Sequence, residues 1–358
     1  MRIVVAMSGG VDSSVAAALL TEQGHEVIGL SMQLYDQRGP ETFGSCCSLD
    51  DLQDARRVAT ALGFPHYIVN FEREFRETVI ANFVGEYAAG RTPLPCAHCN
   101  SDMKFSTLLD RARGLGAAHV ATGHYARVEQ AASGRWLLKR SADPEKDQSY
   151  FLFSLTQDQL AGAVFPVGSL RKAEVRDQAR RLGLQVADKP DSQEICFVPD
   201  GDYAAFVEKK LAEKKQPAVE RAGTIVDEEG HELALHGGVH RFTVGQRKGL
   251  GIGGTVAPLY VLKIDAESRA VTVGPRAALD RTTLTASGVN WLSIDTPAAP
   301  VRAAAQIRHR HHAASGFVHA LENGRAGFAF DEPQPAVTPG QAVVFYDGDS
   351  VIGGGWID

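Results

Sequence analysis

The sequence predicts an α/β protein, in which a doubly wound parallel sheet is followed by a small β-rich domain and a C-terminal β-barrel. Over the first third of the 358 residues, apolar strand-like runs alternate with helical patterns, which favours a parallel sheet covered on both faces. After residue 200, short β-type runs punctuated by glycine and proline follow one another, as in small β domains and barrels. The length exceeds one ordinary core, and we place three domains at residues 1–200, 201–279 and 280–358.

Hydrophobic patterning places the elements of the first domain. We expect strands at residues 3–7, 27–32, 67–69 and 119–122. We expect helices at residues 14–23, 49–62, 75–89, 105–115 and 172–182, and a hairpin over residues 127–140. Ligands in such sheets bind beyond the carboxyl ends of the strands, where Ser8, Met32 and Gly123 fall.

The rest of the chain is predicted to be mostly β. One more helix is expected at residues 206–215. Short strands are then expected at residues 223–226, 240–244, 260–265, 270–273, 317–321, 326–330, 342–346 and 351–357.

Composition and charge narrow the class of protein. The net charge of −6 argues against a strongly basic, non-specific nucleic-acid binder, although a local basic face is enough for RNA. No apolar run approaches the length of a membrane span, and the N-terminal apolar run is too short for a signal peptide. We therefore expect a cytoplasmic protein that needs no membrane. Five cysteines in so long a chain do not form a disulfide framework.

The stretch SGGVDSS, from Ser8 to Ser14, is expected on a strand–loop–helix turn. N–H groups at a helix start have no partner inside the helix, so such a turn suits an anion, and glycines let the backbone approach a phosphate. Asp12 can hold Mg²⁺ against phosphate oxygens. No lysine follows the glycines as in the common NTPase loop. The stretch instead resembles the loop of the PP-loop ATP pyrophosphatases, which split ATP into AMP and pyrophosphate.

The cysteines allow three interpretations. Cys99 follows two prolines in what we expect to be an extended loop, close to a helix start that favours the thiolate. Cys96, Cys99 and Cys196 could be small buried residues, could hold zinc or an iron–sulfur cluster, or could carry out sulfur transfer through a persulfide. Cys46 and Cys47 are expected to be structural.

A basic stretch points to RNA independently of the cysteines. Residues 301–320 contain no acidic residue, and they carry Arg302, Arg308, His309, Arg310, His311 and His312. Such a stretch on a β domain suits phosphate contacts, although a solvated basic strand is the alternative. The basic glycine-rich loop at residues 246–254 either clamps RNA or forms a tight turn.

Together these motifs resemble one family from the first strand to the last residues. The matching segments are SGGVDSS, CCSLDDLQDARRVA, TPLPCAHCN, ATGHYAR, KDQSYFL, DSQEICF, TVGQRKGLGIGG and PGQAVVFYDGDSVIGGGWI. In this order they resemble the bacterial tRNA-specific 2-thiouridylases, which place sulfur on C2 of the wobble uridine of certain tRNAs. The resemblance implies the adenine nucleotide alpha hydrolase-like fold for the first domain, and ATP and Mg²⁺ as the cofactors.

The resemblance also assigns roles to residues. It implies ATP binding by Ala6, Met7, Ser8, Gly9, Gly10, Val11, Asp12, Ser13, Met32 and Gly123. It makes Cys99 the nucleophile and Cys196 the carrier of a persulfide that a sulfur-relay protein delivers, with a Cys99–Cys196 disulfide left after transfer. It implies tRNA contacts by Leu94, Pro95, Cys96, His124, Lys146, Asp147, Gln148, Arg308, His309 and Gln341.

Two departures from the family pattern bear on these roles. Many members have Asn-Pro-Asp where this chain has Leu94-Pro95-Cys96, so the Asp that is a candidate general base is replaced by Cys96. This departure strengthens the three-thiolate interpretation, a cluster-dependent thiolase. An Arg-Tyr pair of relatives is Arg308-His309 here, and an imidazole can still stack on a base. Two competing functions are a PP-loop ligase that adenylates a small carboxylate or amide, and a non-catalytic RNA-binding module.

Overall fold

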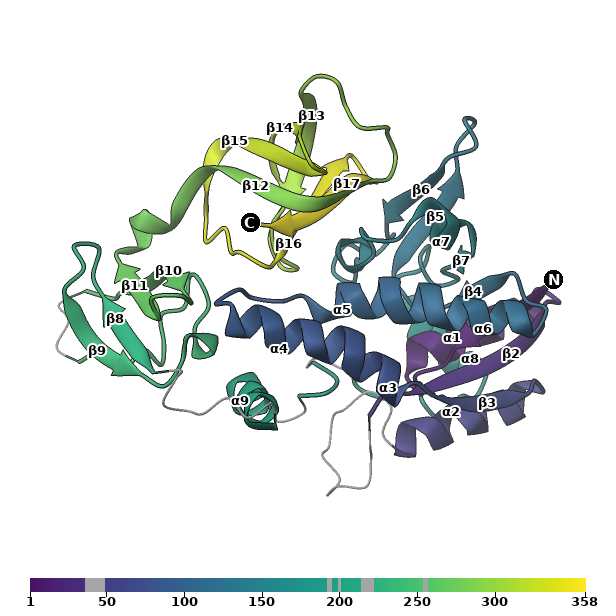
Figure 1. Cartoon of the computed structure of the whole chain (residues 1–358). Helices are drawn as coiled ribbons and strands as arrows, with labels where there is room; N and C mark the ends of the chain where they lie inside the picture. The colour runs from purple at the N-terminus through teal and green to yellow at the C-terminus, as the bar shows by residue number, and fades with distance from the viewer. Residues whose placement is uncertain (36–48, 192–194, 199–200, 214–221, 254–256) are drawn as a thin grey trace. The chain divides into compact units, whose positions relative to one another are not determined.

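The computed structural model describes residues 1–35, 49–191, 195–198, 201–213, 222–253 and 257–358 (Figure 1). They form two compact units. The first contains Met1–Val79, Cys96–Gly201 and Gly348–Val351, and the second contains Ile80–Pro95, Asp202–Asp347 and Ile352–Asp358. Each unit is therefore assembled from separate stretches of sequence. The domain boundaries placed after residues 200 and 279 stay predictions.

The first unit is built on a five-stranded parallel sheet in the order β3-β2-β1-β4-β7. Its strands are β1 (Arg2–Ala6), β2 (Glu26–Gln33), β3 (His66–Asn70), β4 (His119–Ala121) and β7 (Ala163–Val164). Ile3 and Val5 of β1 join an apolar cluster with residues of α1 (Val11–Glu22), α2 (Leu49–Leu62) and α8 (Lys172–Arg181). Val4, which points to the opposite face, is also fully buried. Burial on both faces confirms the predicted doubly wound sheet.

Two helical regions differ from the prediction. The expected helix at residues 75–89 consists of α3 (Glu72–Phe75), a π-helix (Arg76–Ile80) and α4 (Ala81–Ala88). The expected extended loop before residue 105 was wrong, because a helical run starts at Pro95 with α5 (Pro95–His98), continues as a π-helix (Cys99–Thr107) and ends with α6 (Leu108–Gly114). Proline is compatible with the first turn of a helix, where its missing N–H costs no hydrogen bond.

Smaller elements complete the first unit. The predicted hairpin is confirmed as β5 (Ala126–Gln130) paired with β6 (Trp136–Arg140), with Gly134 at a φ of 85° in its turn. A 3₁₀ turn (Ser149–Phe151) and α7 (Gln157–Ala161) follow. None of the helices within the described ranges is both long and apolar enough to cross a membrane.

The second unit contains α9 (Tyr203–Glu213) and a four-stranded sheet in the order β10-β11-β8-β9. Its strands are β8 (Gly223–Val226), β9 (Glu232–His236), β10 (Tyr260–Asp265) and β11 (Ala270–Gly274). The strand expected at residues 240–244 was wrong, because a 3₁₀ turn occupies Val239–Arg241. Gly238, with a φ of 149°, lies just before this turn in a conformation that favours glycine.

The second unit also contains α4 and most of a closed β-barrel, in which β12, β15, β14, β13, β16 and β17 are successive neighbours and β12 pairs with β17. The strands are β12 (Asp280–Trp291), β13 (Val301–Gln306), β14 (Ala314–Leu321), β15 (Arg325–Pro335), β16 (Ala342–Asp347) and β17 (Ser350–Ile357). Phe328 and Phe345 stack in its interior with ring centroids 5.7 Å apart. The predicted barrel is confirmed, although the sequence pattern did not predict β12 and β13 as strands.

Candidate active site

The loop after β1 turns directly into α1, so Asp12 lies in the first turn of this helix rather than in the loop. Gly9 has a φ of 74°, and a Cβ there would lie 2.2 Å from the carbonyl oxygen of Asp51. Gly10 is the N-cap residue of α1. The tight turn therefore depends on glycine, and it places a helix start, with its free N–H groups and positive dipole end, at the carboxyl end of the sheet.

Serine hydroxyls hold this loop in shape. Ser13 Oγ and Ser14 Oγ donate to the carbonyl oxygen of Gly10 at 3.2 and 2.8 Å. The backbone N–H of Ser8 donates to Ser13 Oγ at 3.2 Å. The hydroxyls expected to bind phosphate thus already order the backbone that would receive it. Met7 and Met32, also expected at the nucleotide, are buried at the ends of β1 and β2.

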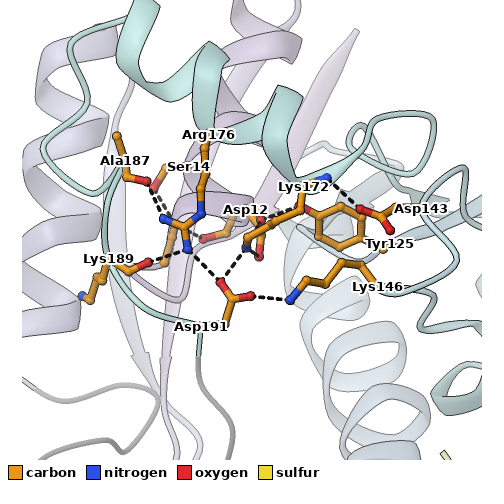
Figure 2. Close-up of polar contacts among 12 residues, drawn as sticks. Asp12, Ser14, Tyr125, Asp143, Lys146, Lys172, Arg176, Ala187, Lys189 and Asp191 are labelled. Atoms are coloured by element: carbon orange, nitrogen blue, oxygen red, sulfur yellow. Dashed lines mark hydrogen bonds and ion pairs between the residues drawn. The ribbon is translucent and has the colours of Figure 1, made fainter. Parts of the chain in front are cut away.

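Asp12, in the first turn of α1, accepts hydrogen bonds from two side chains (Figure 2). Lys172 Nζ donates to both of its oxygens at 2.8 Å, and Tyr125 Oη donates to Oδ1 at 2.7 Å. Burial and the Asp12 charge raise the pKa of Tyr125, so its hydroxyl keeps the proton that it donates. A Cβ on Gly123 would lie 2.5 Å from the backbone nitrogen of Ser13, so only glycine lets the end of β4 approach this turn so closely.

A second carboxylate, that of Asp191, forms ion pairs with three cationic side chains, one of which also contacts Asp12 (Figure 2). Lys172 Nζ lies 2.7 Å from Asp191, Lys146 Nζ 2.8 Å and Arg176 Nη2 3.3 Å. Burial alone would raise the pKa of Asp191, but the hydrogen bonds from Lys146 and Lys172 hold this pKa below its usual value. Lys172 therefore bridges two carboxylates that are far apart in the sequence.

The segment before Asp191 is also attached to the loop. Lys189 Nζ donates to the carbonyl oxygen of Gly9 at 3.1 Å and lies 2.6 Å from Asp51 and 2.7 Å from Asp54 of α2. Burial would lower the pKa of Lys189, but the two carboxylates raise it above its usual value. Arg176 donates to the carbonyl oxygens of Ala187 and Lys189 at 2.7 and 3.0 Å.

The structure places the two expected sulfur-transfer cysteines in the first unit. Cys99 begins the π-helix, and this π-helix contacts α3. Cys196 lies in a tight turn in which Val198 N donates to the carbonyl oxygen of Ile195 at 2.8 Å.

An aromatic contact holds the Cys196 turn to the same short helix. The ring of Phe197 meets that of Phe75 of α3 edge-on at 5.6 Å, so both cysteine-bearing segments are attached to α3. Cys99 and Cys196 are half-buried. Cys46 and Cys47 lie outside the described residues.

The cysteines do not match a single metal ion. Thiolates that share one zinc lie about 2.3 Å from it, so their sulfur atoms lie within about 4.6 Å of one another. Among the described residues, Cys96, Cys99 and Cys196 do not form a group of ligand atoms within 4.8 Å of one another. Cys96 is exposed, whereas Cys99 and Cys196 are half-buried. A larger iron–sulfur cluster would need wider spacing and stays a prediction.

Comparison with known proteins places the chain in a family. The model of the tRNA methyl transferase HUP domain matches residues 1–200, that of the tRNA methyl transferase PRC-barrel domain matches residues 206–275, and that of the aminomethyltransferase beta-barrel domain matches residues 281–357. The chain is 55% identical to tRNA-specific 2-thiouridylase MnmA of Geotalea uraniireducens, over 100% of this chain and 95% of the relative. It is also 55% identical to the MnmA of Solibacter usitatus, over 99% of each chain. The chain belongs to the tRNA-specific 2-thiouridylase family.

Solved structures with weaker likeness were also found. NMN synthetase from Francisella tularensis is 17% identical, with a TM-score of 0.33 over 60% of this chain and 79% of that chain. A 4-thiouridine synthetase–RNA complex with bound ATP is 17% identical, with a TM-score of 0.33 over 59% of this chain and 50% of that chain. These TM-scores are too low to support any conclusion about the present chain.

Two of the residues expected to contact tRNA from the first unit already have partners within the chain. Asp147 accepts hydrogen bonds from Ser149 Oγ and Arg140 Nη1 at 2.8 and 2.9 Å. Gln148 Oε1 accepts from the backbone N–H of Tyr125 at 3.0 Å. Gln148 therefore supports the backbone at Tyr125, whereas Asp147 joins the end of β6 to the 3₁₀ turn at Ser149. Their contact with tRNA stays a prediction.

The expected tRNA residue His124 lies among aromatic rings. The rings of Phe105 and Phe165 lie 6.4 and 6.0 Å from its imidazole, and Nδ1 lies 2.7 Å from Thr122 Oγ1. Burial lowers the pKa of His124 well below its usual value, and the charge of Lys104 adds to this effect. A neutral imidazole therefore stands at the end of β4.

Within the second unit, two expected tRNA residues line one cavity. This cavity, of about 390 Å³, is lined by Thr92, Thr243, Val244, Gly245, Arg308, Ala336, Thr338 and Gln341. Gln341 Nε2 donates to the carbonyl oxygens of Thr92 and Pro93, both at 3.1 Å. Leu94 and Pro95 are buried, whereas Cys96 is exposed. Gln341 therefore fixes the stretch that leads to the cysteine loop.

The basic stretch of the barrel lies partly on strand β13 and partly on the turn that follows it. Arg302 lies 2.6 Å from Asp331 and stacks over Phe317 at 5.0 Å, so it is held by the barrel itself. His309 and Arg310 are exposed in the turn between β13 and β14, while Arg308 Nη1 donates to the carbonyl oxygen of Pro335 at 3.2 Å. The turn, rather than the whole stretch, is the candidate RNA contact.

Sequence reasoning missed Tyr125, Lys172, Lys189 and Asp191. Lys172 and Asp12 are 160 positions apart, so no local spacing brings them together. The available signals were indirect: Tyr125 follows the glycine and histidine at the end of β4, and Asp191 begins the motif that carries Cys196. Neither of these two sequence positions indicates a residue that contacts Asp12 or its partners.

Proposed function

We propose that this chain catalyses ATP-dependent 2-thiolation of the wobble uridine, position 34, of tRNA. The observation that carries the proposal is the 55% identity over the whole chain to relatives named tRNA-specific 2-thiouridylase. The glycine-rich loop at Asp12 and the cysteine pair Cys99 and Cys196 support it, because the reaction needs both an activating nucleotide site and a sulfur carrier.

Activation of the uridine comes first. The C2 carbonyl is a poor electrophile, because oxide is a poor leaving group. Transfer of AMP from ATP to the C2 oxygen releases pyrophosphate and turns that oxygen into part of a good leaving group. The start of α1 stabilises the negative charge that develops on pyrophosphate.

Asp12 is the proposed residue that holds Mg²⁺ at this loop, and the metal when bound would neutralise charge on the phosphate oxygens. A metal ion there would have to take the place of the Lys172 ammonium, which lies against both Asp12 oxygens. Asp12, Ser8 and Ser13 would then orient the departing phosphates.

Sulfur transfer follows on the cysteines. The terminal sulfur of a Cys196 persulfide attacks C2, and AMP leaves with its electron pair. The Cys99 thiolate then attacks the Cys196 sulfur, and the S–S bond to the tRNA breaks to leave a 2-thiouridine. The product of this step is a Cys99–Cys196 disulfide, which a cellular thiol reductant returns to two thiols.

Two macromolecular partners follow from this scheme. The first is tRNA, which the turn at Arg308-His309 and the helical segment at Cys96 would contact, together with Lys146 and His124. The second is a sulfur-relay protein that delivers sulfane sulfur to Cys196. The chemistry needs no membrane, and we propose that it takes place in the cytoplasm.

The experiment that tests this proposal incubates the purified protein with ATP, Mg²⁺, a persulfide donor and unmodified tRNA. We expect AMP and 2-thiouridine to form in equal amounts, with AMP formation dependent on tRNA. AMP formed equally well without tRNA, from a small carboxylate or amide, would establish a PP-loop ligase instead. Tight tRNA binding with no ATP turnover would establish a non-catalytic RNA-binding module.

Cys96 separates the persulfide route from a cluster-dependent one. If Cys96, Cys99 and Cys196 bind an iron–sulfur cluster, Cys96→Ala loses cluster and activity together. The persulfide route predicts that iron-free Cys96→Asp protein, supplied with a persulfide donor, still forms 2-thiouridine. Loss of product in that variant, with wild-type activity only after cluster reconstitution, would replace the persulfide route by the cluster route.

A further inference from the structure

We propose that Lys189 is a positioning residue that fixes the peptide between Gly9 and Gly10, so that the backbone N–H of Gly10 is presented to the phosphates of a bound nucleotide. The inference rests on the proposed function for the presence of a nucleotide at this loop. It concerns a lysine that lies outside the loop motif, 180 positions further along the chain. Its basis is a hydrogen bond from the ammonium group of this lysine to a carbonyl oxygen of the loop.

The peptide between Gly9 and Gly10 has no Cβ atom on either side of it. Gly9 has a φ of 74° and Gly10 a φ of −90°. Glycine adopts positive and negative φ about equally readily, so a peptide between two glycines rotates at little steric cost. A Cβ on Gly10 would have Ser8 Oγ as its nearest neighbour, at 3.5 Å, which is an ordinary contact. Steric repulsion alone therefore does not determine which way this peptide faces.

A hydrogen bond from Lys189 selects one orientation of this peptide. Lys189 Nζ donates to the carbonyl oxygen of Gly9 at 3.1 Å. Because the peptide is trans, the N–H of Gly10 points in the opposite direction to that carbonyl group, and so away from Lys189. Without the hydrogen bond, the positive end of α1 attracts the carbonyl oxygen instead. An oxygen turned toward the start of α1 would repel a phosphate there.

The ammonium group of Lys189 is itself held in place. Besides Gly9, it donates to Asp51 Oδ1 at 2.6 Å and to Asp54 Oδ2 at 2.7 Å. An ammonium has three N–H donors, and here three acceptors match them. The backbone of Lys189 is also fixed, since Arg176 Nη2 donates to its carbonyl oxygen at 3.0 Å (Figure 2). Lys189 is therefore placed to orient the loop rather than to bind phosphate itself.

The charges around Lys189 distinguish positioning from a simple attraction of phosphate. One ammonium group lies with the carboxylates of Asp51 and Asp54, so the three side chains together are negative. If charge alone mattered, neutralising all three would strengthen the binding of a triphosphate. If Lys189 acts through the orientation of the peptide, the same change weakens that binding, because the hydrogen bond to Gly9 is lost. The two roles therefore predict changes of opposite sign.

The test compares two ligands by equilibrium dialysis: α,β-methylene ATP with Mg²⁺, and adenosine, which has no phosphate. Lys189→Met should weaken the binding of α,β-methylene ATP about three- to tenfold, because only loops with the Gly10 N–H facing the phosphates bind it. The affinity for adenosine should stay within about twofold of the wild-type value, since the change acts on the phosphate loop. General damage to the fold would weaken both ligands alike.

A combined variant removes the hydrogen bond without leaving charges unpaired. Asp51→Asn, Asp54→Asn and Lys189→Met together should still weaken the binding of α,β-methylene ATP, although the surroundings of the loop are now less negative. Arg181→Gln is the matched control on α8, because Arg181 forms an ion pair with Glu22 at 2.8 Å. This control should bind both ligands as the wild-type protein does.

Three results would overturn the inference: unchanged binding of α,β-methylene ATP by Lys189→Met, equal losses for both ligands, or tighter binding by the combined variant. None of them touches the proposed function, which the formation of 2-thiouridine by the wild-type protein tests separately. A wild-type protein that binds no α,β-methylene ATP would overturn the nucleotide site, and the proposed function and this inference with it. The melting temperature identifies a variant that fails to fold, and if Lys189→Met does so, the combined variant decides.

Discussion

In the first compact unit, the cations around Asp12 are half-buried and contact carboxylates of the chain, as Lys172 and Lys189 do. In the second unit, the barrel interior is apolar, and the cationic Arg310 stands exposed on the turn between two strands. Near Asp12, the cations are therefore paired with carboxylates of the chain. On the barrel turn, the cationic side chain faces the solvent.

The difference teaches how each region can meet an anion. A cation that is already paired either shares its N–H donors between its carboxylate and a phosphate or exchanges one anion for the other, so binding rearranges the site and depends on each partner. An exposed cation meets a phosphate by releasing small counterions, so binding is graded and depends on salt. Substitutions in the first unit should therefore have large, specific effects, and those in the second unit small, additive ones.

The largest expected effect is at the sulfur-transfer cysteines. Cys99→Ser and Cys196→Ser should each leave no detectable 2-thiouridine, because a hydroxyl cannot carry or release sulfane sulfur at neutral pH. Adenylation of tRNA, followed as AMP formation, should persist at least in part. Cys46→Ser and Cys47→Ser are the matched controls and should keep their activity. If either of the first two variants still forms thiolated tRNA in digests analysed by mass spectrometry, the persulfide route is wrong.

Asp12→Ala should come next, with a loss of at least about 100-fold in tRNA-dependent AMP formation, because the charge on the departing phosphates is no longer balanced. Binding of tRNA should change by less than about twofold, since the bonds of Asp12 stay within the nucleotide site. Filter binding and AMP assays on the same preparation measure the two effects. An equally large fall in tRNA affinity would contradict the prediction that Asp12 acts on the nucleotide and not on tRNA binding.

Arg308→Ala combined with Arg310→Ala should weaken tRNA binding by about three- to tenfold and lower the salt slope by about one per lost phosphate contact. Arg302→Ala is the control, because Asp331 and Phe317 already hold that side chain. The measurement is the dissociation constant at several salt concentrations. An unchanged slope in the double variant would mean that the exposed turn faces only solvent.

The smallest effect is expected for the substitution of His124, which should change how the free energy of unfolding depends on pH. Its folded-state pKa lies well below the usual 6.5, so the unfolded chain binds the extra proton first as the pH falls below 6.5. Stability is therefore complete above that pH and declines below it. His124→Gln should reduce the slope of unfolding free energy against pH by up to about 1.4 kcal/mol per unit. Urea titrations between pH 7 and 5 measure it, and identical slopes in both proteins would contradict the burial argument.

Much of the fold could be predicted where the signal is local. A helix at residues 172–182, close to the observed α8, is predicted because an amphipathic run ends at Gly183, which has a φ of 65°. Strand β12 could not be predicted, since alternating threonines such as Thr283 and Thr285 leave few apolar positions to read. The helical run at Pro95 was missed because proline breaks most helices, and only tertiary context shows that this one occupies a first turn.

The candidate site could be predicted only in part, for a related reason. The phosphate loop and the cysteines carry their chemistry in short motifs. The bridge from Asp12 through Lys172 to Asp191 joins three distant segments, and each of these residue types is common on protein surfaces. Only tertiary packing distinguishes a lysine that joins two carboxylates from one that is merely solvated.

The interleaving of the two units has a consequence for synthesis on the ribosome. Residues Ile80–Pro95 emerge early but belong to the second unit, and Gly348–Val351 emerge almost last but belong to the first. The second unit is therefore complete only after Ile352–Asp358 have been made, whereas the first unit lacks only Gly348–Val351 once residue 201 has been made. For the same reason, a single cut anywhere between residues 80 and 347 separates residues of the first unit from one another.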